Sequence, residues 1–190
     1  MSEPPERLNQ MPDPADLEEP ELPDMEKQIL VAGVGNAWLG DDGFGGHVVN
    51  RLIEMGVPPG VQVQDFGSGG LDLAYEVMRG YHAMVLVDVS QQGGEPGDVY
   101  VIEPDPDQIK PIEDGEAISP HGMDPQTVLR FVKTVHGWPG KIVVVGCEPA
   151  DTESVGLELS EPVKAAVDRA AAVVLDQLNQ LQSDAAYEPS

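Results

Sequence analysis

Three acidic side chains and one histidine occupy positions in the chain where they could bind a cation together. Asp41 and Asp42 are adjacent, Asp88 directly follows an apolar run, and His121 lies in a proline-flanked loop sequence. Two carboxylates and one imidazole suit a borderline divalent ion such as nickel, zinc or iron. Three protein ligands leave coordination positions open, as a catalytic or transiently occupied site requires. Asp42, Asp88 and His121 are therefore our candidate metal-contacting residues.

The first two acids belong to a strand, glycine turn and helix. The apolar run 29–32 has the pattern of a strand buried on both faces of a parallel sheet, and the turn G-V-G-N-A-W-L-G-D-D-G-F-G follows it. Apolar residues then recur at helical spacing, so we expect a helix to begin near Phe44 or Gly45. This arrangement places negative charge at the carboxyl edge of a sheet, where open α/β sheets bind ligands.

The same residues also have ordinary structural explanations, which the local sequence leaves open. Asp41 and Asp42 could cap the helix that follows them, because carboxylates complement a helix N-terminus. Asp88 could likewise cap a loop, and His121 could be a plain surface histidine. The edge location favours a site, since a buried carboxylate at a strand end needs a partner or a cation.

The remaining pattern predicts one α/β domain. Further strands are expected at 61–66, 83–87, 98–103 and 142–145, and further helices at 71–78, 128–135 and 160–182. The run 98–103 alternates and follows a neighbouring strand closely, which indicates an antiparallel neighbour or edge. We predict a three-layer sandwich with a mostly parallel twisted sheet of about five strands and helices on both faces.

Composition bounds the domain and its partners. Residues 1–27 are acidic and proline-rich and are expected to be disordered, 28–183 form the α/β domain, and 184–190 form a flexible tail. The net charge of -24 argues against nucleic-acid and anionic-membrane binding. The single cysteine, Cys147, and the lack of a signal pattern or membrane span predict a cytoplasmic protein. We expect it to be a monomer.

Three common site motifs are excluded, one of them at the glycine turn. The dinucleotide fingerprint G-x-G-x-x-G fails because Trp38 occupies its third glycine position, and the acids that follow would repel a pyrophosphate. The chain also lacks H-E-x-x-H and a G-x-S-x-G elbow, so a conventional hydrolase signature is missing.

Several motifs in the same order resemble the hydrogenase maturation proteases. They are G-V-G-N-A-W-L-G-D-D-G-F-G, D-F-G-S-G-G-L-D-L, V-L-V-D, S-P-H-G-M-D-P and V-V-G-C-E-P, and they extend over residues 29–181. The glycine-acid motif is specific to this family. Each of the later motifs is weak evidence alone, but together they support the resemblance.

The resemblance implies an aspartyl endopeptidase-like enzyme. Such an enzyme removes a C-terminal extension from the nickel-loaded precursor of a nickel–iron hydrogenase large subunit. The family's metal-contacting acids match Asp42, which is glutamate in some members, and Asp88, and its histidine matches His121. These three residues are also the expected catalytic residues. Nickel would be carried by the substrate and would serve for recognition, and no tightly held cofactor is expected. Asp41 and Asp65 match family positions of less certain role.

Two other function classes remain as alternatives. A non-catalytic nickel-binding scaffold or chaperone for the same subunit would use the site only for recognition and would bind the precursor without cutting it. An ordinary small-molecule metallohydrolase would keep tightly bound zinc through purification.

Overall fold

The computed structural model describes residues 24, 27–113, 116 and 125–185 of the chain. Its strands are β1 (Ile29–Val34), β2 (Val61–Gly67), β3 (Ala83–Val89), β4 (Val99–Ile102) and β5 (Lys141–Cys147). Its helices are α1 (Phe44–Met55), α2 (Gly70–Val77), α3 (Pro125–Thr134) and α4 (Glu161–Ala185), with a short 3-10 helix η3 (Gly40–Gly43) before α1. Each strand and helix predicted from the sequence corresponds to one of these elements.

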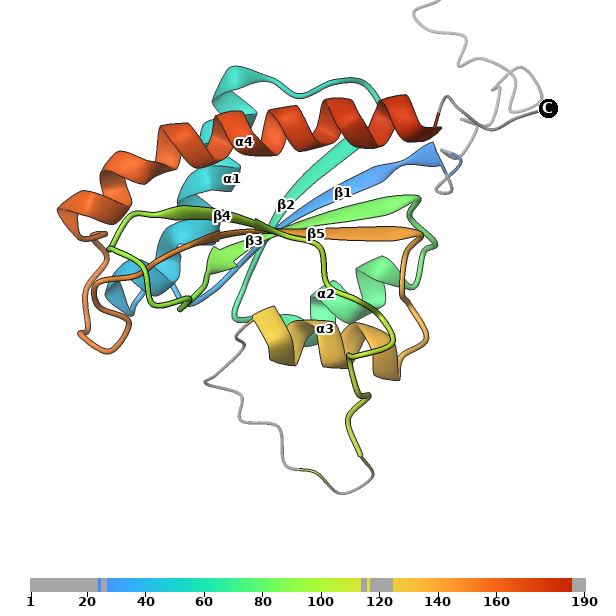
Figure 1. Cartoon of the computed structure of the whole chain (residues 1–190), viewed down its shortest axis with the longest axis horizontal. Helices are drawn as coiled ribbons and strands as arrows, with labels where there is room; N and C mark the ends of the chain where they lie inside the picture. The colour runs from blue at the N-terminus through green and yellow to red at the C-terminus, as the bar shows by residue number, and fades with distance from the viewer. Residues whose placement is uncertain (1–23, 25–26, 114–115, 117–124, 186–190) are drawn as a thin grey trace, which may run out of the picture.

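The five strands form one sheet in the order β2-β1-β3-β5-β4. All neighbouring strands are parallel except β4, which runs antiparallel to β5. The edge position predicted for β4 is confirmed, but its partner is β5, not the preceding strand β3. Helices α1 and α4 cover one face of the sheet, and α2 and α3 cover the other (Figure 1). The predicted α/β sandwich is therefore confirmed.

Alternating side chains of the buried strands divide the interior into two cores. Ile29 and Val31 face the core that α1 and α4 share, whereas Leu30 and Ala32 face the core beneath α2 and α3. Every residue of β1 is buried, which explains its continuous apolar sequence, because a central parallel strand has no solvent face.

The strand order places a topological switch point between β1 and β3. The chain leaves β1 for β2 on one side and later returns to β3 on the other side. Loops that leave the carboxyl ends of β1 and β3 therefore diverge and leave a crevice, where ligands bind in open α/β sheets. The loop from Gly35 to Gly43 follows β1, and Asp88 lies at the end of β3.

Helix α1 approaches the sheet closely because it contains a glycine at the contact. A Cβ added at Gly45 would collide with the carbonyl oxygen of Val34 and would lie 2.6 Å from that of Val87. Only glycine permits this approach, which fixes the start of α1, and therefore the preceding acidic turn, against the ends of β1 and β3.

The structure describes the C-terminal end of the domain but not the first 23 residues of the chain. Helix α4 continues to Ala185, so the domain limit predicted at 183 falls inside this helix. Residues 1–23, for which disorder was predicted, lie outside the described residues. Among the residues that the structure describes, no helix has both the length and the apolar character needed to cross a membrane.

Candidate active site

The backbone of Asp42 and the side chain of Asp88 both lie close to Gly35, the residue that follows β1. Gly35 has a φ of +124°, a conformation that favours glycine, and an added Cβ would collide with the carbonyl oxygen of Asp42. The same Cβ would lie 3.5 Å from Oδ1 of Asp88. The backbone of Asp42 and the carboxylate of Asp88, from residues 46 positions apart in the chain, therefore both lie next to Gly35 at the switch point.

Asp42 is half-buried in η3 and lines a pocket that is open to solvent. Its Oδ2 accepts a hydrogen bond of 2.8 Å from the backbone N–H of Asn36. Burial raises the pKa of Asp42 above its ordinary value, and the Asn36 hydrogen bond offsets only part of this rise. A carboxylate with a raised pKa is suited to accept a proton or to bind a cation.

Asp88 is almost fully buried at the end of β3, with 1% of its surface exposed. Its Oδ1 accepts a 2.7 Å hydrogen bond from the backbone N–H of Val89. Asp88 is not among the residues that line the pocket, but Val89 and Ser90, which follow it, are. The carboxylate therefore lies just behind the pocket wall, next to Gly35.

His121, the third residue of the candidate set, lies outside the described residues, and so does the rest of its motif up to Asp124. Within the described part of the chain, no three His, Cys, Asp or Glu side chains come together in a way that could hold a metal ion. The members of the candidate set that the structure describes are Asp42 and Asp88. The predicted convergence of His121 with them stays a prediction.

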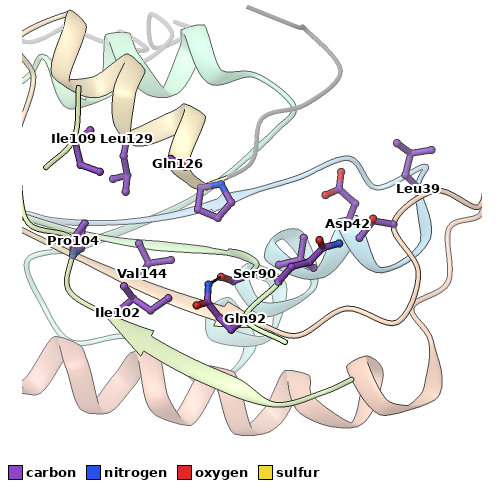
Figure 2. A pocket seen from close by; sticks show the side chains of 14 residues that line it. Leu39, Asp42, Ser90, Gln92, Ile102, Pro104, Ile109, Gln126, Leu129 and Val144 are labelled. Atoms are coloured by element: carbon purple, nitrogen blue, oxygen red, sulfur yellow. Dashed lines mark hydrogen bonds between the residues drawn. The ribbon is translucent and has the colours of Figure 1, made fainter. Parts of the chain in front are cut away.

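The pocket beside Asp42 has a volume of about 660 Å³ and joins segments that are far apart in sequence. Its lining comes from the η3 loop, the loop after β3, β4 and the segment after it, β5, and the start of α3. Figure 2 shows Asp42 and Leu39 at one end, aliphatic side chains at the other, and Ser90 and Gln92 between them. A volume of this size accommodates several residues of an extended peptide.

Asp41 has a structural role that neither sequence interpretation anticipated. It is fully buried and points away from the pocket of Asp42, toward the segment 150–160. Its Oδ2 accepts hydrogen bonds from the backbone N–H groups of Ala150 (2.8 Å) and Asp151 (2.9 Å) and from the hydroxyl of Ser160 (2.9 Å). Its Oδ1 accepts the N–H of Ser160 at 2.7 Å. We call this arrangement the Asp41 clamp.

Neither acid caps α1. The N-cap residue of this helix is Gly43, and no side chain forms a cap hydrogen bond there. The adjacent acids have separate tasks instead: Asp41 holds the segment 150–160 against η3, and Asp42 faces the pocket. Thr152, which belongs to the clamped segment, is itself part of the pocket lining.

Glu148 fixes the loop that follows β3, which contributes Ser90 and Gln92 to the pocket lining. Its carboxylate accepts backbone N–H groups from Gln92 (2.8 Å), Gly93 (3.3 Å) and Gly94 (3.3 Å) and the hydroxyl of Tyr100 (2.9 Å). Burial raises the pKa of Glu148, but these hydrogen bonds outweigh it and lower the pKa below its ordinary value. Glu148 thus holds in place the loop that brings Ser90 and Gln92 to the pocket.

The other sequence candidates lie away from the pocket lining. His47 is exposed on α1, and Asp65 accepts a 2.9 Å hydrogen bond from the N–H of Gly67 at the end of β2. Cys147 is buried at the end of β5, as predicted for a packed residue. Burial and the nearby charge of Asp41 raise the pKa of its thiol to about 11, which makes it a poor nucleophile.

Comparisons with known proteins identify the family of this chain. The sequence profile of the hydrogenase maturation proteases (HycI) matches residues 46–177. A putative hydrogenase maturation protease of Methanocaldococcus jannaschii is 32% identical over 161 residues, which cover 82% of this chain and 99% of that protein.

Solved structures of similar proteins share the fold. The hydrogenase 2 maturation peptidase of Thaumarchaeota archaeon SCGC_AB-539-E09 matches with a TM-score of 0.60 and 32% identity, over 80% of this chain and 99% of that one. The hydrogenase maturating endopeptidase HybD of E. coli matches with a TM-score of 0.65 and 26% identity, over 80% and 93%. The chain therefore belongs to the hydrogenase maturation proteases and is a peptide-bond hydrolase.

Proposed function

We propose that this protein removes a C-terminal extension from the nickel-loaded precursor of a nickel–iron hydrogenase large subunit. Asp42, Asp88 and His121 contact the nickel that the precursor carries, and this contact presents the scissile bond at the pocket. The observation that carries the proposal is that Gly35 adjoins both the backbone of Asp42 and the carboxylate of Asp88, at the switch point of a chain that belongs to this family of proteases. The nickel is part of the substrate, not a resident cofactor.

Asp42 is the better of the two acids for proton transfer. It lines the pocket, and its raised pKa makes it a stronger base than an ordinary carboxylate. It accepts the proton of the attacking water, while the nearly buried Asp88 places a carboxyl oxygen next to Gly35. A nickel ion in contact with both would, when bound, polarise the carbonyl group of the scissile bond.

The surface beside Asp42 suits a protein substrate. Leu39 in the η3 loop pairs with Gly156, and three large apolar side chains on these two segments are exposed: Trp38 (66%), Val155 (87%) and Leu157 (57%). Exposed tryptophan and aliphatic residues grouped beside a pocket are typical of a protein–protein contact. This feature favours a large precursor over the small-molecule substrate of an ordinary metallohydrolase.

The test is incubation of the purified protein with nickel-loaded precursor, followed by mass measurement of both chains. We expect a released C-terminal peptide and a shortened large subunit, with no release from nickel-free precursor. Asp176→Asn is the control, because Asp176 is an exposed acid on α4 that does not line the pocket. Stable binding of the loaded precursor without release would support the scaffold alternative and overturn the protease proposal.

A further inference from the structure

One end of the pocket differs in chemistry from the end that holds Asp42. Its walls are the aliphatic or proline side chains Ile102, Pro104, Ile109, Leu129 and Val144, which Figure 2 shows opposite Asp42 and Leu39. We call this set the apolar end. Within the described residues that line the whole pocket, none is Lys, Arg or His, so the pocket offers an anionic group no counter-charge.

The apolar end is an uncovered margin of the protein core. Leu129 and Val144 are buried members of the core beneath α2 and α3. Ile102 and Ile109 pack against that core but are only partly buried. An aliphatic group placed there would pack against the apolar side chains of α3 and β4 that face the pocket, and it would bury apolar surface that is now only partly covered.

We infer that the apolar end receives an aliphatic side chain of the substrate peptide, within a few residues of the bond that is cut. The inference rests on the proposed function and adds to it a specificity subsite. Asp42 and the apolar end line one pocket, so a peptide bound beside Asp42 has a path along that pocket to the apolar end. At 660 Å³ the pocket exceeds one side chain, and room remains for the peptide backbone.

Polar groups in the middle of the pocket suit a peptide backbone. The side-chain amide of Gln92 donates a 2.8 Å hydrogen bond to the hydroxyl of Ser90, and both face the space between the two ends (Figure 2). An amide and a hydroxyl offer both donors and acceptors to the peptide groups of the substrate. A charged side chain at the apolar end would lose its hydration without gaining a partner, so the subsite should reject it.

The first experiment varies the substrate. Each residue within three positions of the cleaved bond in nickel-loaded precursor is replaced singly by Ala and by Asp, and kcat/KM is measured from peptide release. We expect one aliphatic position at which Asp lowers kcat/KM at least about a hundredfold and Ala about tenfold, with smaller effects elsewhere. Equal cleavage of all these precursors would overturn the inference while leaving the proposed function intact. No release from any precursor would overturn both.

The second experiment varies the enzyme at the same subsite. Ile109→Ala and Ile102→Ala enlarge the apolar end, so we expect Phe at the sensitive substrate position to gain at least about fivefold relative to Leu. Val101→Ala is the matched control, because Val101 neighbours Ile102 on β4 but is exposed and outside the pocket lining. Thermal unfolding of each variant verifies folding. An unchanged Phe-to-Leu preference in both folded variants would assign the apolar end no role in specificity.

Discussion

Ser160 donates hydrogen bonds to both carboxylate oxygens of Asp41, from its backbone N–H at 2.7 Å to Oδ1 and from its hydroxyl at 2.9 Å to Oδ2. This double contact joins the turn after β1 to the residue directly before α4. With the N–H groups of Ala150 and Asp151, it surrounds a fully buried charge with donors, which is the condition under which a buried carboxylate is tolerated.

Loss of the Asp41 clamp should strongly destabilise the fold. Asp41→Ala removes the acceptor of the N–H groups of Ala150, Asp151 and Ser160 and leaves a space where a fully buried side chain stood, and we expect a loss of about 3 kcal/mol or more in the free energy of unfolding. Urea unfolding followed by circular dichroism measures it. Asp42→Ala is the matched control, with an expected loss below about 1 kcal/mol, because Asp42 is half-buried. Equal losses in both variants would contradict the clamp.

Substitutions of Asp42 and of the two other candidate site residues should lower activity rather than stability. Asp42→Asn, Asp88→Asn and His121→Ala should each fold and yet reduce precursor processing at least about a hundredfold, because in the proposed mechanism each removes a group that acts on the nickel or on a proton. Processing is followed by mass measurement of the released peptide, with circular dichroism as the folding check. Full activity of His121→Ala would remove that residue from the site.

The hydrogen bonds of the Glu148 carboxylate should make the stability of the fold depend on pH. Its pKa in the folded protein lies below the ordinary value of 4.5, so its hydrogen bonds stabilise the fold fully above pH 4.5, and that stabilisation is lost as the pH falls through the folded pKa. The unfolding free energy of the wild type should therefore exceed that of Glu148→Gln by more at neutral pH than in acid. Urea unfolding at several pH values measures the difference, and a constant difference would show that the charge has no such role.

Cys147 should be inert in the native protein. Its thiol is buried and has a pKa of about 11, so at neutral pH almost no thiolate is present or accessible. We expect an aromatic disulfide reagent to label the folded protein very slowly and to label it rapidly in urea, since Cys147 is the only cysteine. Rapid labelling of the folded chain would contradict the burial of this residue and exclude its use as a reporter of unfolding.

Much of the fold could be predicted because burial leaves a local signature. The fully apolar runs of β1, β3 and β5 identify central parallel strands, and the alternation in β4 identifies an edge. The strand that β4 pairs with could not be read in the same way. Its neighbour β5 lies nearly forty residues later, and pairing between distant strands leaves no mark within either segment.

The candidate site was predictable only in part, for a similar reason. Asp42 and Asp88 follow buried strands, so their common edge could be deduced from strand order. The role of Asp41 could not, because its donors are mostly backbone N–H groups, which every residue except proline supplies. The apolar end of the pocket also escaped prediction, since its side chains belong to separate elements that read as ordinary core residues.

The Asp41 clamp also bears on when the pocket comes into existence during synthesis. Asp41 and Ser160 are 119 positions apart, so the clamp closes only after most of the chain has left the ribosome. Thr152, which completes the pocket beside Asp42, belongs to the segment that the clamp holds. A nascent chain that has folded only its first strands therefore lacks the side of the pocket that Thr152 forms. The complete pocket forms only after the segment 150–160 has been made and held by Asp41.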